Sequence, residues 1–345
     1  MNSLFCLVSR QPMANTIPVL KYMPPKVLLF STNEENKVAD QLEKLFKSKN
    51  LWVKRINNLD AYDYHSFRRN ISRQLSQLEN AAWLNLTGGT KLMALAAYEI
   101  FTERNKNVIY CNTEKKQIIH LFPVYKTEAI DLAISIEDYL LAYGYNVISI
   151  KRELPEDKIK LFKLIEHTKC HDQFVMFSKK IRETIKLDEP QKSCCTIHWQ
   201  YYKNYDKITI VHIKSKSKFT FEQKNFMHGI WLEEFAYYTL INNINHNFDD
   251  IAYDIKIQTI DGLENQIDVA FIRNSRLYLI SCKSGIKDEN SALYEIETLR
   301  QLTGGTYASG YNLITRIPCE KFVRRANELS IKLININELN KFSFI

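Results

Sequence analysis

The sequence predicts an α/β protein with two folded units joined by a basic segment. Apolar runs of strand length alternate with segments of helical period through the first half of the chain, which is typical of a mostly parallel sheet with right-handed crossovers. A second alternation of helix and strand begins near residue 226 and continues to the end. We therefore expect one unit over 1–150, a connector over 151–225 and a second unit over 226–345.

Length and composition favour a folded protein with two cores. Hydrophobic residues make up 45% of the 345 residues and aromatic residues 12%, which excludes a disordered chain. No apolar run reaches the roughly 18 residues that a membrane-spanning helix needs, so we expect no membrane partner. Seven scattered cysteines, an odd number in a chain of this size, predict reduced thiols and a cytoplasmic location.

The net charge of +8 is unevenly distributed along the chain. Residues 151–228 hold 17 Lys and Arg against 10 Asp and Glu, whereas residues 229–345 hold 12 against 15. A basic flank attracts phosphates and an acidic centre attracts cations, so this distribution favours a protein that acts on nucleic acid. For the middle segment taken by itself, an ordinary solvated face explains the lysines better.

The elements of the first unit follow from apolar periodicity and turn residues. Strands are expected at 4–9, 26–31, 52–56, 81–86, 107–111 and 117–122, and helices at 34–49, 64–78, 92–102 and 127–144, with a short apolar segment at 16–22 and a further strand at 147–150. In such sheets ligands bind beyond the carboxyl ends of the strands, so the residues that follow the strands are candidates for a binding site.

The loop Thr87-Gly88-Gly89-Thr90-Lys91 predicts an anion site at one of those strand ends. Its glycines allow a close backbone approach, the helix that follows directs free N–H groups at the same place, and Lys91 adds a charge. Neither Gly-x-x-x-x-Gly-Lys nor Gly-x-Gly-x-x-Gly is present, which excludes a Walker loop and a dinucleotide fingerprint. A tight turn with a threonine cap is the alternative explanation.

The remaining elements are assigned in the same way. The connector is expected to hold helices at 156–167 and 172–185 and strands at 195–201 and 207–212, and its His and Cys residues match no zinc-binding spacing. The second unit is expected to hold a helix at 231–241, strands at 252–259, 267–272 and 277–282, helices at 292–302 and 319–329, and strands at 312–315 and 331–336.

Asp268 and Lys283 mark a candidate catalytic site in the second unit. Each interrupts an apolar strand, and the polar turn Asn274-Ser275 would join the two strands as a hairpin. Strand interiors disfavour both residue types, so the presence of Asp268 and Lys283 in these strands requires an explanation. A carboxylate can bind a cation that lowers the pKa of a water, and a lysine can steady the developing charge. From these two residues alone, a partly buried ion pair is an equally good explanation.

Both ends of the chain resemble known domains. The runs from Leu7 to Asn15 and from Asn85 to Met93 resemble the CARF domain, the Rossmann-like sensor of type III CRISPR defence. The combination of Asp268 and Lys283 with an acid on the preceding helix resembles the restriction-endonuclease-like α/β fold of the PD-(D/E)xK superfamily. In this order and at this length, the pair resembles CARF–nuclease effectors, which cut nucleic acid when a cyclic oligoadenylate binds.

The resemblance implies a homodimer that binds the activator, usually cyclic tetra-adenylate, on its two-fold axis. It also implies Mg²⁺ or Mn²⁺ as cofactor and DNA, RNA or both as substrate. The activator would contact residues at the strand ends of the first unit, namely Ser9, Arg10, Gln11, Asn15, Thr32, Thr87, Gly88, Gly89, Thr90 and Lys91. Asp268, helped by Glu233, would hold the metal, and Lys283 would position or activate the attacking water.

Ser281 departs from the family pattern, which has an acid two residues before the lysine. A serine is a poor ligand for a hard cation. Some restriction endonucleases of the superfamily share this serine and recruit a glutamate from the next helix, where this chain offers Glu295 and Glu297. Of the two we prefer Glu297 as the additional metal ligand, and the backbone carbonyl of Cys282 is a further candidate. If the site is degraded instead, the chain would be a ligand-gated regulator that binds nucleic acid without cutting it.

Overall fold

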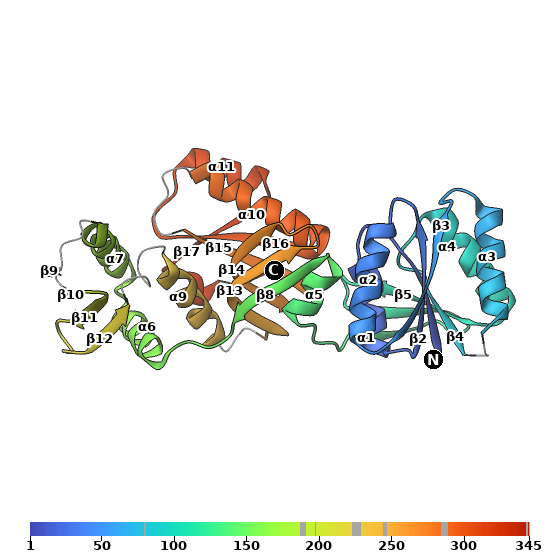
Figure 1. Cartoon of the computed structure of the whole chain (residues 1–345), viewed down its shortest axis with the longest axis horizontal. Coiled ribbons are helices and arrows are strands. Elements are labelled where there is room, and N and C mark those ends of the chain that lie inside the picture. The colour runs from blue at the N-terminus through green and yellow to red at the C-terminus, as the bar shows by residue number, and fades with distance from the viewer. Residues whose placement is uncertain are drawn as a thin grey trace.

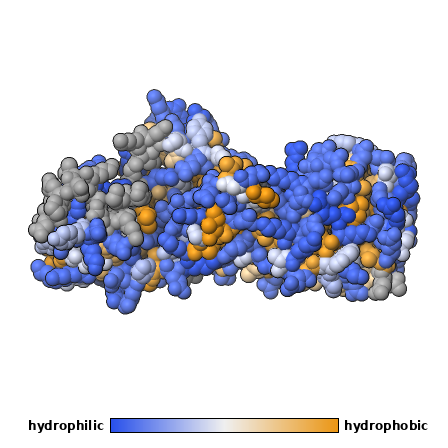
Figure 2. Space-filling model, in the orientation of Figure 1, coloured by the Kyte–Doolittle hydropathy of each residue, from blue (hydrophilic) through white to orange (hydrophobic). Residues whose placement is uncertain are grey.

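The computed structural model describes residues 1–78, 81–186, 191–196, 198–222, 229–243, 247–283, 289–342 and 344. The molecule is elongated, with the N-terminal sheet at one end, the C-terminal sheet in the middle and a smaller module at the other end (Figure 1). On the face shown in Figure 2, hydrophilic residues cover most of the surface and hydrophobic patches are small. No helix in the described ranges has both the length and the apolar character needed to cross a bilayer.

The N-terminal unit is a seven-stranded sheet in the order β3-β2-β1-β4-β5-β6-β7. Its strands are β1 (Ser3–Leu7), β2 (Lys26–Thr32), β3 (Trp52–Leu59), β4 (Ala82–Asn85), β5 (Asn107–Asn112), β6 (Gln117–Phe122) and β7 (Lys126–Ala129). The first five in the sheet order are parallel, whereas β6 and β7 are antiparallel. This confirms the predicted parallel α/β sheet.

Four helices cover the two faces of this sheet, namely α1 (Met13–Tyr22), α2 (Asn36–Ser48), α3 (Tyr64–Ser76) and α4 (Lys91–Glu103). Side chains alternate along each strand, so Leu4 and Cys6 of β1 pack with α1 and α2. Phe5 and Leu7 point to the other face and pack with α3 and α4. Both faces are therefore buried, which explains why the strands read as continuous apolar runs.

The C-terminal unit is a mixed six-stranded sheet in the order β17-β16-β15-β14-β13-β8. Its strands are β8 (Tyr145–Lys151), β13 (Asp250–Thr259), β14 (Glu264–Arg273), β15 (Arg276–Lys283), β16 (Ala308–Ile314) and β17 (Lys332–Asn335), and its helices are α9 (Ile230–Ile241), α10 (Glu289–Thr303) and α11 (Glu320–Glu328). Helix α9 packs against one face of the sheet and α10 against the other. The candidate catalytic strands β14 and β15 thus lie between two helices.

The segment expected to be a connector folds into a module of its own. It comprises α6 (Glu156–Thr168), α7 (His171–Lys186) and an antiparallel sheet of β9 (Gln191–Cys195), β10 (Trp199–Asn204), β11 (Lys207–His212) and β12 (Lys218–Glu222). Trp199 is fully buried against Phe174 and Phe177 of α7, and this core continues into Trp231 of α9. The module is therefore packed against the C-terminal unit.

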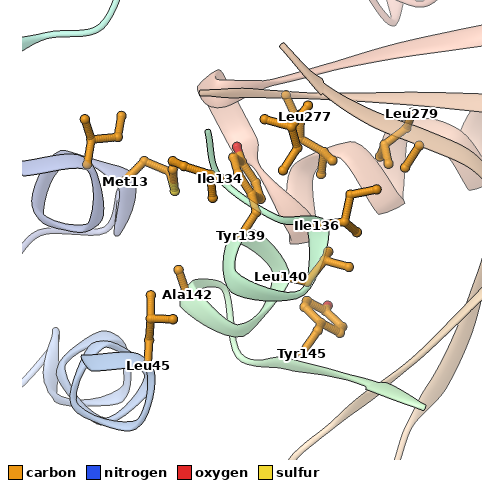
Figure 3. Close-up of a cluster of buried hydrophobic side chains, with 14 of the residues drawn as sticks. Met13, Leu45, Ile134, Ile136, Tyr139, Leu140, Ala142, Tyr145, Leu277 and Leu279 are labelled. Atoms are coloured by element: carbon orange, nitrogen blue, oxygen red, sulfur yellow. The ribbon is translucent and has the colours of Figure 1, made fainter. Parts of the chain in front are cut away.

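The short helix α5 (Ile136–Ala142) lies between the N-terminal and C-terminal sheets. One hydrophobic core runs from Leu45 of α2 through Leu140 of α5 to Leu279 of β15 (Figure 3). The hydroxyl of Tyr139 donates a hydrogen bond to the carbonyl oxygen of Tyr307, 3.0 Å away, in the short 3-10 helix η1 (Gly305–Tyr307). The two sheets are therefore joined by packed side chains as well as by the chain.

Three sequence predictions are corrected here. The helix expected at 127–144 is β7 followed by α5, because residues 126–129 complete the sheet edge beside β6 and Ser135 caps a new helix start. The apolar segment at 16–22 is part of α1, which begins at Met13. The strand expected at 195–201 is two strands, since β9 ends at Cys195 and β10 begins at Trp199.

The unit boundary expected at residue 150 does not coincide with the end of the N-terminal sheet. The strand expected at 147–150 is found as β8, but it pairs with β13. The N-terminal sheet therefore ends at Ala129, and the expected limit at 150 falls within a strand of the C-terminal sheet. The expected boundary at 225 lies outside the described residues.

We expect Leu140→Ala to lower the free energy of unfolding by about 2–5 kcal/mol, because it opens a cavity in the core that both sheets share. Urea denaturation followed by fluorescence measures the change. Ile317→Ala is the control, since this side chain is 90% exposed and its loss should cost less than about 0.5 kcal/mol. Equal stability of the two variants would contradict the shared core.

Candidate active site and candidate sensor pocket

The hairpin of β14 and β15 brings the candidate catalytic residues together. Arg273 pairs with Arg276, and the two turn residues Asn274 and Ser275 have φ values of 57° and 59°. Positive φ at both positions is the type I′ geometry that suits a two-residue hairpin. The predicted hairpin is therefore confirmed, and its register places the end of β15 beside Asp268.

Asp268 is held by the backbone and side chains of β15. The N–H of Cys282 donates a hydrogen bond to Asp268 Oδ2 at 2.7 Å, and the Ser281 hydroxyl donates to the same oxygen at 3.4 Å. Lys283 Nζ lies 3.9 Å from that oxygen and 3.3 Å from Glu295 Oε2. Ser281 thus orients the aspartate with a weak hydrogen bond.

Strand β13 is bent next to the site. Asp254 has a φ of 47°, in the left-handed region, and the pairing of β13 with β8 shifts register around it. As a result Tyr253 packs on the α9 side of the sheet and Ile255 on the α10 side, although strict alternation would put both on one face. The bend turns the Asp254 carboxylate toward the same pocket as Asp268.

The pocket has a volume of about 860 Å³ and opens between α9, α10 and the bent strands. Four carboxylates and two lysines line it: Glu233, Asp254, Asp268, Glu295, Lys256 and Lys283. Lys151 forms an ion pair with Asp254 at 2.7 Å, and Gln266 donates a hydrogen bond to it at 3.1 Å. Asp254 is therefore partly neutralised, as Asp268 is by Lys283, whereas Glu233 forms no ion pair with a described residue.

Glu233 is the most perturbed acid of the pocket. It lies in the first turn of α9, it is 6% exposed, and its Oε2 atom has no hydrogen-bond partner. Burial raises the pKa of Glu233, and the nearby Asp268 and Asp254 carboxylates add to the shift, to about 8. A buried carboxyl without a partner, next to a second carboxylate, is suited to binding a cation.

Asp268 and Lys283 are shifted in the same direction for different reasons. Burial raises the pKa of Asp268, although Lys283 and the Cys282 N–H oppose this. Burial lowers the pKa of Lys283, but Asp268 and Glu295 raise it by more, so the net shift is upward. Lys283 is therefore protonated at neutral pH, as a group that stabilises negative charge must be.

The donor set of the pocket fits a hard divalent cation. Carboxylate oxygens are the ligands that Mg²⁺ prefers, and Mg²⁺ commonly takes one or two of them and completes its shell with water and phosphate oxygens. Within the described ranges, no three His, Cys, Asp or Glu side chains are already gathered around one point. The residues that fit such an ion are Asp268 and the partnerless Glu233.

The other sequence candidates lie in different places. Glu297 accepts hydrogen bonds from Arg300 and Gln301, and it does not line the pocket. Residues two apart on a helix are turned by about 200°, so Glu295 and Glu297 cannot both face this pocket. The geometry favours Glu295, and metal binding by Glu297 stays a prediction. Cys282 contributes its N–H to Asp268, and metal binding by its carbonyl stays a prediction. Glu234 is bound by Lys158 of α6.

A second pocket, of about 750 Å³, lies at the carboxyl ends of β1, β2 and β3. Six of the predicted ligand-binding residues line it: Ser9, Arg10, Gln11, Thr32, Gly89 and Thr90. Gly89 has a φ of 75°, and the Thr90 side chain caps α4 by accepting a hydrogen bond from the Met93 N–H. The predicted loop therefore serves both as a helix cap and as a wall of the pocket.

Four predicted residues do not line this pocket. Asn15 is buried and donates to the carbonyl oxygen of Leu7 at 2.8 Å, and Thr87 accepts a hydrogen bond from the Cys111 N–H at 2.7 Å. A Cβ atom on Gly88 would lie 2.1 Å from the Leu7 carbonyl oxygen, so this glycine permits the close approach of two strand ends. The fourth, Lys91, is exposed at the start of α4. These residues shape the loop behind the pocket wall.

Sequence reasoning missed the part of the pocket wall formed by the end of β3. There Asn58 and Tyr62, together with Asn33 after β2, line the pocket with amide and aromatic groups that suit nucleobases. Applying the strand-end rule to β3, which neighbours β2, would have found Asn58 and Tyr62. Glu35 also lines the pocket and pairs with Arg10 at 3.5 Å, so the rim is mixed in charge.

The fold and its two pockets define a protein in which a Rossmann-like sensor precedes a nuclease-like domain. Residues 4–139 match the family model of the Card1 CARF domain, and residues 220–343 match that of the Card1-like endonuclease domain. The chain therefore carries a domain of the Card1 CARF family followed by a domain of the Card1-like endonuclease family. Among curated proteins, none matches the chain by sequence.

Solved structures share the fold at low sequence identity. Can2 from Sulfobacillus thermosulfidooxidans, in complex with cyclic tetra-adenylate, has a TM-score of 0.77 at 19% identity, over 99% of this chain and 95% of that one. VC1899 from Vibrio cholerae also has a TM-score of 0.77, at 16% identity over 98% and 95%. A type III CRISPR defence DNA nuclease activated by cyclic oligoadenylate has 0.63 at 16%, over 92% of this chain and 46% of that one.

The raised pKa of Glu233 predicts how stability depends on pH. A carboxyl whose pKa is near 8 in the folded state and about 4.3 when unfolded stabilises the protein at low pH, and this contribution is lost as the pH rises through 8. In the absence of metal, we expect the wild type to lose about 2–3 kcal/mol more stability than Glu233→Gln between pH 6 and pH 9.

Thermal unfolding over this pH range, in buffer with a chelator, measures the difference. Adding Mn²⁺ at pH 9 should raise the Tm of the wild type more than that of Glu233→Gln, because the ion binds the ionised carboxylate. Parallel pH profiles of the two proteins would show that Glu233 ionises normally.

Proposed function

We propose that the chain is a metal-dependent endonuclease of type III CRISPR defence that a cyclic oligoadenylate switches on. The observation that carries the proposal is the pocket that gathers Asp268, Glu233, Glu295 and Lys283 in a domain of the Card1-like endonuclease family. The substrate is DNA, RNA or both, and the activator is cyclic tetra-adenylate, the ligand with which Can2 was solved.

In the proposed reaction, Asp268 and Glu233 would hold Mg²⁺ or Mn²⁺. The ion would lower the pKa of a water and offset the phosphate charge. Without metal, Glu233 is largely protonated at neutral pH because its pKa is raised to about 8, so it would have to release this proton to hold the ion. Lys283 stays protonated and stabilises the negative charge that develops on the phosphoryl oxygens. Its ion pair with Glu295 holds the Lys283 side chain in position.

The sensor half binds the activator with the pocket at the ends of β1, β2 and β3. Thr90 and Gly89 present the N-terminus of α4 to phosphate, and Asn33, Asn58 and Tyr62 suit the adenine bases. Next to this pocket, α4 exposes the apolar side chains of Leu92 and Leu95, the latter 60% exposed. We infer that a second copy covers them in a homodimer, so that the ring lies on the two-fold axis.

A chain of contacts joins the two pockets. The Tyr143 hydroxyl lies 3.1 Å from Gln11 Oε1, in the sensor pocket, and 2.9 Å from the carbonyl oxygen of Gly304, directly after α10. Helix α10 carries Glu295 in the candidate active site. A ligand that moves Gln11 therefore has a short path by which to shift α10 and the carboxylate that contacts Lys283.

The second candidate function is a ligand-gated regulator that binds nucleic acid without cutting it. Ser281 favours it, because the hydroxyl donates to Asp268 where the family has an acid that would bind metal. This candidate predicts activator-dependent binding with no product under any divalent cation.

We expect cleavage of plasmid and single-stranded substrates in Mn²⁺ to depend on cyclic tetra-adenylate and to fall by about 10²-fold or more in Lys283→Ala, because a donor to the developing charge is lost. Gel analysis with and without the activator measures it. Glu295→Gln should lower cleavage more than Glu297→Gln, since only the former faces the pocket. Cutting that persists in Lys283→Ala would reject the assigned site, and activator-dependent binding without cutting would favour the regulator.

A further inference from the structure

A third pocket, of about 880 Å³, lies between the module of residues 156–222 and helix α9, apart from the two pockets already described. Lysines and a histidine form its rim: Lys160, Lys163 and His167 come from α6 and Lys218 from β12. The buried rings of Phe219 and Tyr238 contribute to its floor. The proposed function above uses none of these residues.

The basic rim continues onto the turn between β11 and β12. Lys214 and Lys216 are exposed there, next to Lys218. Hydrogen bonds brace the turn: His212 Nδ1 lies 2.8 Å from the Ser215 hydroxyl, which lies 2.9 Å from that of Ser217. The lysines are therefore presented along a braced hairpin beside the helix.

The described lining of the pocket carries more positive than negative charge. Glu166 is the one acidic residue among the described lining residues. Burial raises the pKa of Glu166, and the Thr239 hydroxyl donates a hydrogen bond to it at 3.1 Å. Lys160 pairs with Glu156 at 2.7 Å, so Lys163 and Lys218 are the cations of the pocket to test.

Helix α9 connects this pocket with the candidate active site. Its first turn carries Glu233 in the active-site pocket, and Tyr238, about 7.5 Å further along the axis, lines the basic one. A buried ion pair between Lys158 of α6 and Glu234 of α9 fixes the two helices to each other. The lysines of α6 are thereby held at a set distance from the cutting site.

We propose that this basic pocket binds the phosphate backbone of the nucleic-acid strand that is cut in the candidate active site. The inference rests on the proposed function and adds an accessory substrate surface to it. Lysines that line an open groove bind phosphates without reading sequence, and each phosphate contact adds close to one unit to the salt dependence of binding. The basic pocket therefore raises the affinity for long strands and takes no part in hydrolysis.

The test compares wild type with the double variant Lys163→Ala/Lys218→Ala in the full-length protein with cyclic tetra-adenylate. Fluorescence anisotropy of a labelled 40-nucleotide strand, in Ca²⁺ to prevent cutting, measures affinity from 50 to 300 mM salt. We expect about tenfold weaker binding near 0.1 M salt, and a slope of log K against log salt that is smaller by about 1.5. Lys26→Ala/Lys115→Ala, two exposed lysines of the N-terminal sheet, is the matched control.

Hydrolysis of bis(p-nitrophenyl) phosphate in Mn²⁺ separates this inference from the proposed function. We expect the ratio of kcat/KM for the long strand to that for the small diester to fall about tenfold in the double variant. Unchanged affinity and slope in the double variant, or an equal loss in the matched control, would overturn the inference. If the wild type hydrolyses neither substrate, the proposed function fails, and the anisotropy still decides whether the pocket binds a strand.

Discussion

Helix α5 is the constraint on which the rest of the structure depends. Its apolar side chains are buried between two sheets, so the core that begins at Leu45 continues without a break to Leu279. Close-packed interiors have low compressibility and transmit strain, because side chains cannot move without displacing their neighbours. A sensor and a nuclease joined in this way form one packed body, and Tyr143 adds a polar contact along the same junction.

The residues of the candidate active site lower the stability of the folded protein. Three features of the site cost stability: the buried Glu233 oxygen without a hydrogen-bond partner, the left-handed backbone of Asp254 in a bent strand, and the buried Asp268 carboxyl, whose pKa burial raises. Such features cluster where charge has to be bound or moved, and here they surround one pocket. Ser281 fits this arrangement as a group that orients Asp268, and in the proposed reaction the second carboxylate comes from Glu233 on α9.

Much of the fold could be predicted from local pattern, and most errors arose from tertiary context. Apolar periodicity located the buried strands and the type I′ hairpin that positions Asp268. Periodicity could not show that the strand at 147–150 belongs to the C-terminal sheet, because the sequence of one strand does not indicate which strand it pairs with. Glu295 and Glu297 were separable by helix geometry once the buried face of α10 was known. Asn15, Thr87 and Gly88 were recognised as part of the loop, but only packing shows that they lie behind the pocket wall.

The sensor pocket and the candidate active site are coupled if ligands bound in either one shift the same conformational equilibrium. Each ligand then changes the affinity of the protein for the other, which calorimetry can measure. Calorimetry of cyclic tetra-adenylate binding, with and without an uncut nucleic-acid strand in Ca²⁺, gives the coupling between the pockets. We predict that the strand changes activator affinity about fivefold or more in the wild type, and by a smaller factor in Tyr143→Phe, which loses the hydroxyl shared by Gln11 and Gly304. Identical activator affinities with and without the strand would contradict the account.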